Sequence, residues 1–193
     1  MTDPIRVVLA LAGASGAAIG VRIGELLAEA GCETHLVVTP AAERTLAHEV
    51  GADALGRLEG LVHRRHAIDD VGAVIASGSL PTAGMIVAPC SMRVVGAIAA
   101  TIAGDLLVRA ADVHLKERRP LILMPRETPL HLGHLRALTA VTEYGAVVMP
   151  PMPAFYLKPT SIEEMIDELA RRALALLRLP NTTAPTAWLG DRT

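Results

Sequence analysis

A small turn rich in glycine follows the first apolar run of the sequence. Residues 13–16 read Gly-Ala-Ser-Gly and lie between an apolar run, 5–11, and a helical pattern over 17–30. Backbone N–H groups at the start of a helix attract anions, and the hydroxyl of Ser15 adds a donor, so Gly13, Ala14 and Ser15 are candidates to bind a phosphate. The turn lacks the G-x-G-x-x-G spacing of dinucleotide folds, which favours a mononucleotide over NAD. The alternative is a tight turn without a ligand.

Two more polar side chains follow apolar runs that are typical of strands. Thr39 comes directly after residues 34–38, and Arg126 follows residues 121–124. The carboxyl ends of parallel strands meet at one edge of a sheet, so both side chains could reach the same phosphate, the arginine with a two-pronged grip. The alternatives are a helix cap for Thr39 and an ordinary surface arginine for Arg126.

The histidines and cysteines do not form a pattern typical of a metal site. His63 and His66 are three residues apart without a carboxylate or cysteine at a recognised interval, so we interpret them as exposed loop residues and expect no metal. Cys32 and Cys90 are the two cysteines, which fits a reducing cytosol rather than a disulfide-rich secreted domain. Cys90 is interpreted as a small buried residue rather than a nucleophile.

The elements that must position these residues alternate along the chain. Such alternation predicts a single-domain α/β fold with a doubly wound parallel sheet, in which residues 1–180 form the domain and 181–193 a polar, Pro-rich tail. Residues 40–70 are polar and weakly helical, and we assign them no firm structure. We expect strands at 5–11, 34–38, 73–76, 85–88, 121–124 and 146–149, and helices at 17–30, 91–103, 105–118, 131–144 and 161–176.

Composition and charge exclude several classes of protein. The net charge of -2 and the pI near 6.4 give no general attraction to nucleic acid. Gly, Pro or a charge interrupts every apolar stretch before it could span a bilayer, so we expect no membrane segment. The acidic Asp3 and the amphipathic sequence after the first apolar run argue against a secretory signal, and we expect a cytoplasmic protein.

Several ungapped blocks, taken together, resemble the flavin prenyltransferases (UbiX-type, related to the phenylacrylic acid decarboxylase-like flavoproteins). The similarity runs from about residue 5 to residue 177. The blocks are ASGS at 76–79, TAGMIVAPCSM at 82–92, RAADV at 109–113, LKERR at 115–119, RETPL at 126–130 and PPMPAFY at 150–156.

The resemblance implies a Rossmann-like flavoprotein that transfers a dimethylallyl group from dimethylallyl phosphate to N5 and C6 of reduced FMN. Its product, prenylated FMN, would serve a UbiD-type decarboxylase, and the chain would form a homo-oligomer of trimers that pair into a dodecamer. The residues that match the FMN site are Gly13, Ala14, Ser15, Thr39, Ser91, Met92 and Arg126. Those that match the substrate site are Leu80, Arg109, Lys116, Tyr156 and Arg172, of which Lys116, Tyr156 and Arg172, with Glu127, match catalytic positions.

The residue types suit those roles. Two cations and a phenol can hold a phosphate and stabilise it as it leaves, and the Glu127 carboxyl could carry a proton. Arg172 is preferred over Arg171 because its spacing places it nearer the buried stripe of the last helix. The alternatives are a solvated charge run for Lys116, packing at a Pro-rich corner for Tyr156, a solvated Arg172, and a salt bridge for Glu127.

The sequence also departs from the family's pattern. The family's aromatic after Ser-Gly-Ser is Leu80 here, and leucine offers no π face to an allylic cation. Ile19, Thr39-Pro40 and Asp105-Leu106-Leu107 replace other family residues. Two alternatives therefore stay open: a relative that binds FMN or prenylated FMN without prenylating it, and a flavin-dependent decarboxylase or oxidoreductase that leaves its flavin unaltered.

Overall fold

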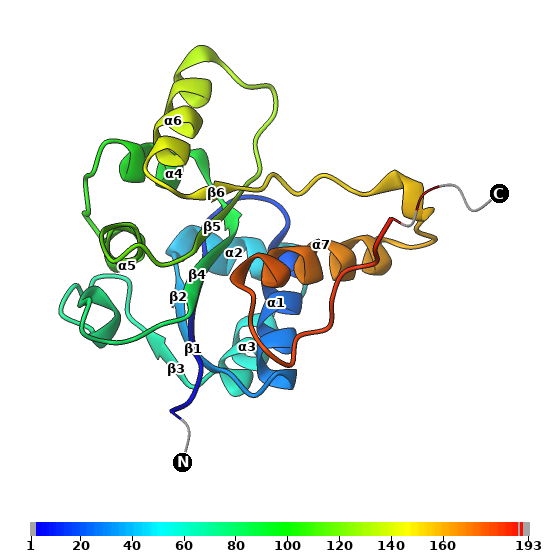
Figure 1. The fold of residues 1–193 in the computed structure, drawn as a ribbon, viewed down its shortest axis with the longest axis horizontal. Helices are drawn as coiled ribbons and strands as arrows, with labels where there is room; N and C mark the ends of the chain where they lie inside the picture. The colour runs from blue at the N-terminus through cyan, green and yellow to red at the C-terminus, as the bar shows by residue number, and fades with distance from the viewer. Residues whose placement is uncertain (1–2, 189, 191–193) are drawn as a thin grey trace.

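The computed structural model, which describes residues 3–188 and 190, contains one six-stranded parallel sheet between two layers of helices (Figure 1). Its strand order is β3-β2-β1-β4-β5-β6, so the chain starts in the middle and winds outward in both directions. This arrangement confirms the predicted doubly wound α/β fold. The strands are β1 Arg6–Leu11, β2 Glu33–Val38, β3 Arg64–His66, β4 Gly84–Cys90, β5 Leu121–Pro125 and β6 Val147–Val148.

The helices divide into two groups, one on each face of the sheet (Figure 1). One face carries α1 Ala17–Glu29, α2 Pro40–Glu49, α3 Ala54–Leu61 and α7 Ile162–Leu177. The other carries α4 Met92–Ala99, α5 Leu106–Lys116 and α6 Leu132–Glu143. Two short 3₁₀ helices, η1 Val74–Ala76 and η2 Phe155–Leu157, lie in the connections.

The central strand shows how the sequence creates two cores. Side chains alternate across a strand, so Leu9 and Leu11 belong to the α1 and α7 side while Val8 and Ala10 belong to the α4 and α5 side. All four are fully buried. A strand buried on both faces must be apolar throughout, which is why the first strand reads as a continuous apolar run.

Three of the helices begin at a residue whose side chain caps the first turn. Thr39 Oγ1 accepts from the amide of Ala42 at 3.2 Å and begins α2. Asp105 Oδ1 accepts from the amide of Val108 at 3.0 Å and begins α5. Ser161 begins α7 as predicted, with its hydroxyl accepting from the amide of Glu164, while the Glu164 carboxylate accepts from Thr160 rather than from Ser161. These caps satisfy N–H groups that have no partner within the helix.

Two expectations about local structure were wrong, and one segment that was left unassigned contains regular structure. The predicted strand at 73–76 is wrong: Val74–Ala76 form the 3₁₀ helix η1, because β1 pairs directly with β4 and leaves no place in the sheet, while Ile75 packs into the α5-side core. Residues 40–70, which received no firm structure, contain α2, α3 and the edge strand β3. His66 is not an exposed loop residue, because it ends β3 and is 3% exposed.

Within residues 3–188 and 190, no helix combines the length and the apolar character needed to cross a membrane.

Candidate functional site

The predicted FMN-binding residues follow the ends of neighbouring parallel strands. The turn of residues 13–16 follows β1, Thr39 follows β2, Ser91 follows β4 and Arg126 follows β5. A Cβ added to Gly13 would lie 2.2 Å from the Cβ of Ala41, so the turn packs directly on the first turn of α2. The sheet thus brings these residues to one edge, and only glycine fits at the closest approach.

An acidic residue that the sequence analysis did not identify occupies the start of α1. Glu49, the last residue of α2, accepts hydrogen bonds through Oε2 from the amides of Gly16 at 2.8 Å and Ala17 at 2.9 Å. An acidic group at the C-terminal end of a helix opposes the helix dipole, and that unfavourable position is the signal by which it could have been noticed. Its carboxylate shows that the first turn of α1 binds an anion.

The environment of Glu49 keeps it ionised. Burial acts to raise its pKa, but hydrogen bonds from Ser15, Ala17 and Gly16 and the nearby positive charge of Arg126 lower the pKa below its usual range. In the part of the chain that the structure describes, the Arg126 guanidinium has no ion-pair partner within contact distance. The carboxyl edge of the sheet therefore combines the Glu49 carboxylate, at the start of α1, with the Arg126 guanidinium, which is available to bind a phosphate.

Residues around the end of β4 suit the neighbourhood of a flat ligand. Ser91 begins α4, yet its hydroxyl makes no capping hydrogen bond, while the neighbouring Met92 is 9% exposed. Cys90 is fully buried, and burial raises the pKa of its thiol to about 12. A protonated, inaccessible thiol is not a nucleophile, so Cys90 is a packing residue, as predicted.

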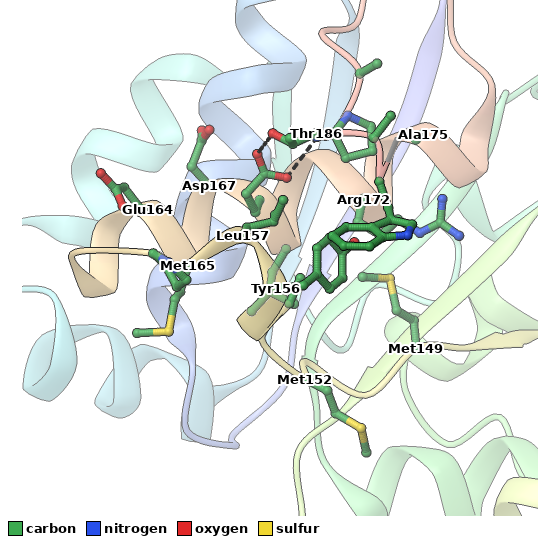
Figure 2. Close-up of a pocket in the computed structure, with 18 of the residues that line it drawn as sticks. Met149, Met152, Tyr156, Leu157, Glu164, Met165, Asp167, Arg172, Ala175 and Thr186 are labelled. Carbon is green, nitrogen blue, oxygen red and sulfur yellow. Dashed lines mark hydrogen bonds between the residues drawn. The ribbon is translucent and has the colours of Figure 1, made fainter. Parts of the chain in front are cut away.

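A large cavity lies elsewhere, between α7 and the C-terminal segment. It has a volume of about 1060 Å³ and is lined by Tyr156, Arg172 and Trp188 among others. Figure 2 shows Tyr156, Arg172 and Thr186 around it, with dashed lines for the hydrogen bonds of Thr186. Tyr156 and Arg172 thus contribute a phenol and an exposed cation to one cavity, although they are 16 residues apart.

The C-terminal segment is part of this cavity's wall. The amide of Thr186 donates to Glu168 Oε2 at 3.1 Å, and its hydroxyl donates to Oε1 at 2.5 Å. Trp188 lies edge-on to Tyr156 with ring centroids 5.3 Å apart. Residues 181–188, the described part of the polar, Pro-rich tail, are attached to α7 of their own chain through Thr186.

The two arginines of α7 have different surroundings. Arg171 Nε donates to Asp167 Oδ2 at 2.5 Å, and Asp167 Oδ1 accepts from Arg22 of α1 at 2.7 Å. Arg171 therefore helps to join α7 to α1. Arg172 is exposed and lines the cavity, so it is the arginine of this pair that a ligand can reach.

Lys116 and Arg109 do not join Tyr156 and Arg172 within one chain. Both belong to α5, on the opposite face from α7, and Lys116 lines a second cavity of about 410 Å³. Arg109 donates to Asp112 Oδ2 at 2.6 Å and to the carbonyl of Ala76 at 3.2 Å, and Lys116 pairs with Glu117.

Two other predicted residues lie at the margins of these sites. Glu127 is exposed, and its carboxylate accepts only the amide of Thr128, at 3.1 Å, among the residues described. Leu80 is half-buried and packs against the α5-side core. Also within the described chain, no group of three or more His, Cys, Asp and Glu side chains could hold a metal ion.

Residues 1–173 match the family described as Flavoprotein. The chain belongs to that family. It is 51% identical over 170 residues to the flavin prenyltransferase UbiX of Thauera aromatica, an alignment that covers 88% of this chain and 87% of the relative. The resemblance to the flavin prenyltransferases is therefore confirmed over most of the sequence.

Solved structures of flavoproteins have the same fold. AnUbiX (PadA1), in complex with FMN and dimethylallyl pyrophosphate, is 42% identical, has a TM-score of 0.90, and matches 96% of this chain and 100% of its own. The dodecameric FMN-dependent UbiX-like decarboxylase from Escherichia coli O157:H7 is 38% identical, with the same TM-score and the same coverage. The flavoprotein fold extends over nearly the whole chain.

Proposed function

We propose that this chain is a flavin prenyltransferase that joins a dimethylallyl group from a prenyl phosphate to reduced FMN and forms prenylated FMN. The observation that carries the proposal is the 42% identity and matching fold with a protein that binds both FMN and dimethylallyl pyrophosphate. The chain's own chemistry agrees with this role, because it has an anion-binding edge and a cavity that holds a cation beside a phenol.

The sheet edge fits the phosphate of FMN. The Glu49 carboxylate already shows that the amides of Gly16 and Ala17 bind an anion, and Arg126 is a nearby cation. We assign the phosphate to Arg126, Thr39 and the turn of Gly13, Ala14 and Ser15. The free hydroxyl of Ser91 and the side chain of Met92 would then lie beside the ring.

The donor site requires more than one copy of the chain. Lys116 and Arg109 lie on α5 and Tyr156 and Arg172 on the opposite face, so no single chain surrounds a donor phosphate with all four. We assign the site to an interface in a homo-oligomer, where α5 of one copy meets the α7 cavity of another. The dodecameric relative has an assembly of the kind that this requires.

The residues of this site have separable tasks in prenyl transfer. FMN, when bound and reduced, supplies the nucleophilic atoms N5 and C6. The phosphate gains negative charge as its bond to the allylic carbon breaks. The cations Lys116 and Arg172 offset this charge and the Tyr156 hydroxyl donates a hydrogen bond to it, which lowers the barrier to ionisation. Glu127 is our candidate to carry a proton, since its carboxylate has no cation attached in the described chain.

Leu80 favours one competing function. Its half-buried position in the α5-side core places an aliphatic group where relatives have an aromatic, so a binding protein for FMN or prenylated FMN is the second candidate. A flavin-dependent decarboxylase is a third candidate, because one similar structure is an FMN-dependent UbiX-like decarboxylase.

We also propose a cytoplasmic location for the protein and delivery of the prenylated FMN to a UbiD-type decarboxylase.

The mass of the flavin separates these functions. Purified protein is incubated anaerobically with reduced FMN and dimethylallyl phosphate, and the extracted flavin is analysed by mass spectrometry. A prenyltransferase yields FMN heavier by one prenyl unit, with Lys116→Ala as the impaired control. A binding protein returns unaltered FMN despite tight binding, and a decarboxylase returns unaltered FMN while it consumes a carboxylic acid.

A further inference from the structure

Arg119, which follows α5, makes several hydrogen bonds to the loop of residues 77–82. Arg119 donates from Nη2 to the carbonyl of Gly78 at 2.6 Å and from Nη1 to the carbonyl of Leu80 at 2.6 Å. Nη1 also lies 3.3 Å from the hydroxyl oxygen of Thr82. These contacts join positions 37 to 41 residues apart, and all use a charged donor, which makes them stronger than neutral hydrogen bonds.

A buried histidine completes this attachment. His114 is 1% exposed, with Nδ1 2.7 Å from the carbonyl of Ala110 and Nε2 2.9 Å from the hydroxyl of Thr82. A carbonyl only accepts, so Nδ1 carries a proton, and in the neutral ring Nε2 then accepts from Thr82. The Thr82 hydroxyl therefore donates to His114 and accepts from Arg119. Burial and the Arg119 charge lower the His114 pKa, in agreement with the neutral ring.

The attached loop touches the predicted donor-binding cation. A Cβ on Gly78 would lie 2.9 Å from Lys116 Nζ and 2.1 Å from Glu117 Oε1, so the Lys116–Glu117 pair lies directly against the Gly78 backbone. At the same end of the loop, Arg109 donates to the carbonyl of Ala76 at 3.2 Å. A shift of the loop would therefore change the position of the Lys116 ammonium.

We propose that Arg119 and His114 are positioning residues, which hold the 77–82 loop against the end of α5 and so fix Lys116 for the phosphate of the donor. The inference rests on the proposed function, because it takes Lys116 to bind that phosphate. Neither residue needs to touch donor or flavin. Their effect is on the affinity for the donor, since an ammonium that samples several positions binds a fixed phosphate less well.

The test is the steady-state kinetics of Arg119→Gln with dimethylallyl phosphate. Loss of the charged donors should raise KM for the donor about tenfold, while the affinity for FMN changes less than twofold. Arg119→Lys keeps the charge but cannot reach both carbonyls at once, so its KM should lie between those of wild type and Arg119→Gln. Arg57→Gln, which removes an exposed arginine from α3, is the matched control and should leave KM unchanged.

Thr82→Val keeps the shape of the side chain and breaks only the link between Arg119 and His114, so it serves if Arg119→Gln fails to fold. It should raise the donor KM about threefold without changing FMN affinity. An unchanged donor KM in folded Arg119→Gln or Thr82→Val, with only a lower Tm, would overturn the inference and leave the proposed function intact. A wild-type protein that transfers no prenyl group would instead overturn the proposed function and this inference with it.

Discussion

The Glu49 carboxylate accepts a hydrogen bond from the amide of Gly16, with 2.8 Å between Oε2 and the amide nitrogen. The C-terminal end of α2 therefore places an anion at the start of α1. A phosphate beside Ser15 must compete with that carboxylate for the same amides. Glu49→Gln weakens the competitor, because a neutral amide is a poorer acceptor, and should increase the preference of the protein for FMN over riboflavin about fivefold. Fluorescence titration of both flavins measures this ratio.

Arg126→Gln is the matched control for that experiment. It removes the cation rather than the anion, so the preference for FMN should fall about tenfold while riboflavin binds as before. Equal preferences in wild type, Glu49→Gln and Arg126→Gln would place the phosphate of FMN away from this edge.

Two inactive variants should restore each other if Lys116 and Arg172 act from different copies. Lys116→Ala and Arg172→Gln, each at least tenfold slower than wild type alone, are co-expressed with different affinity tags and purified through both tags. Random assembly leaves roughly a quarter of the shared sites intact, so roughly a quarter of the wild-type rate should return. Assemblies that remain as slow as the single variants would mean that one chain contributes both residues to each site.

Trp188 is the only tryptophan of the chain, so its fluorescence reports on the C-terminal segment. The hydroxyl and the amide of Thr186 both attach this segment to Glu168, and Glu168→Ala, which removes the acceptor of both hydrogen bonds, should release it. We expect the emission of Trp188 to move toward that of a solvated indole and the donor KM to rise about threefold, because Trp188 no longer packs edge-on against Tyr156. Unchanged emission together with an unchanged KM would show that the attachment has no part in donor binding.

The buried histidine pair predicts how stability depends on pH. His35 Nδ1 lies 2.9 Å from His66 Nε2, and burial, followed by the charges of His66 and His63, lowers the pKa of His35 to about 4. Between about pH 6.5 and pH 4, His35 is protonated in the unfolded chain but neutral in the folded chain. The contribution of His35 to the free energy of unfolding is therefore fully present above about pH 6.5 and is lost as the pH falls toward 4. Urea unfolding should show that the free energy of unfolding decreases less between pH 7 and pH 5 for His35→Asn than for wild type. Equal decreases would refute the assignment of this pH dependence to His35.

Continuous patterns along the chain predicted most of the fold. The apolar run before Gly13, the helix that follows, and the helix cap at Ser161 each depend on residues within a few positions, so periodicity and caps were sufficient. The run at 73–76 was misassigned because four apolar residues are compatible with any buried element. Only the pairing of β1 with β4 excludes it from the sheet.

Parts of the site depend on contacts between residues far apart in the sequence, which local sequence patterns do not predict. His66 is buried because β3 pairs with β2 beside His35, 31 residues earlier. Glu49 meets Gly16 across 33 residues, and Arg119 reaches Gly78 across 41. Resemblance to a family indicated candidate positions such as Arg172 and implied that they meet Lys116 across neighbouring subunits. The fold shows the physical basis, because α7 and α5 lie on opposite faces of the sheet.

The most direct test is a single-turnover reaction with labelled dimethylallyl phosphate, in which label on the flavin and free phosphate are counted together. Prenyl transfer predicts that the label moves to FMN and that one phosphate is released for each flavin converted. Phosphate release without labelled flavin, or tight FMN binding with neither product, would contradict the account.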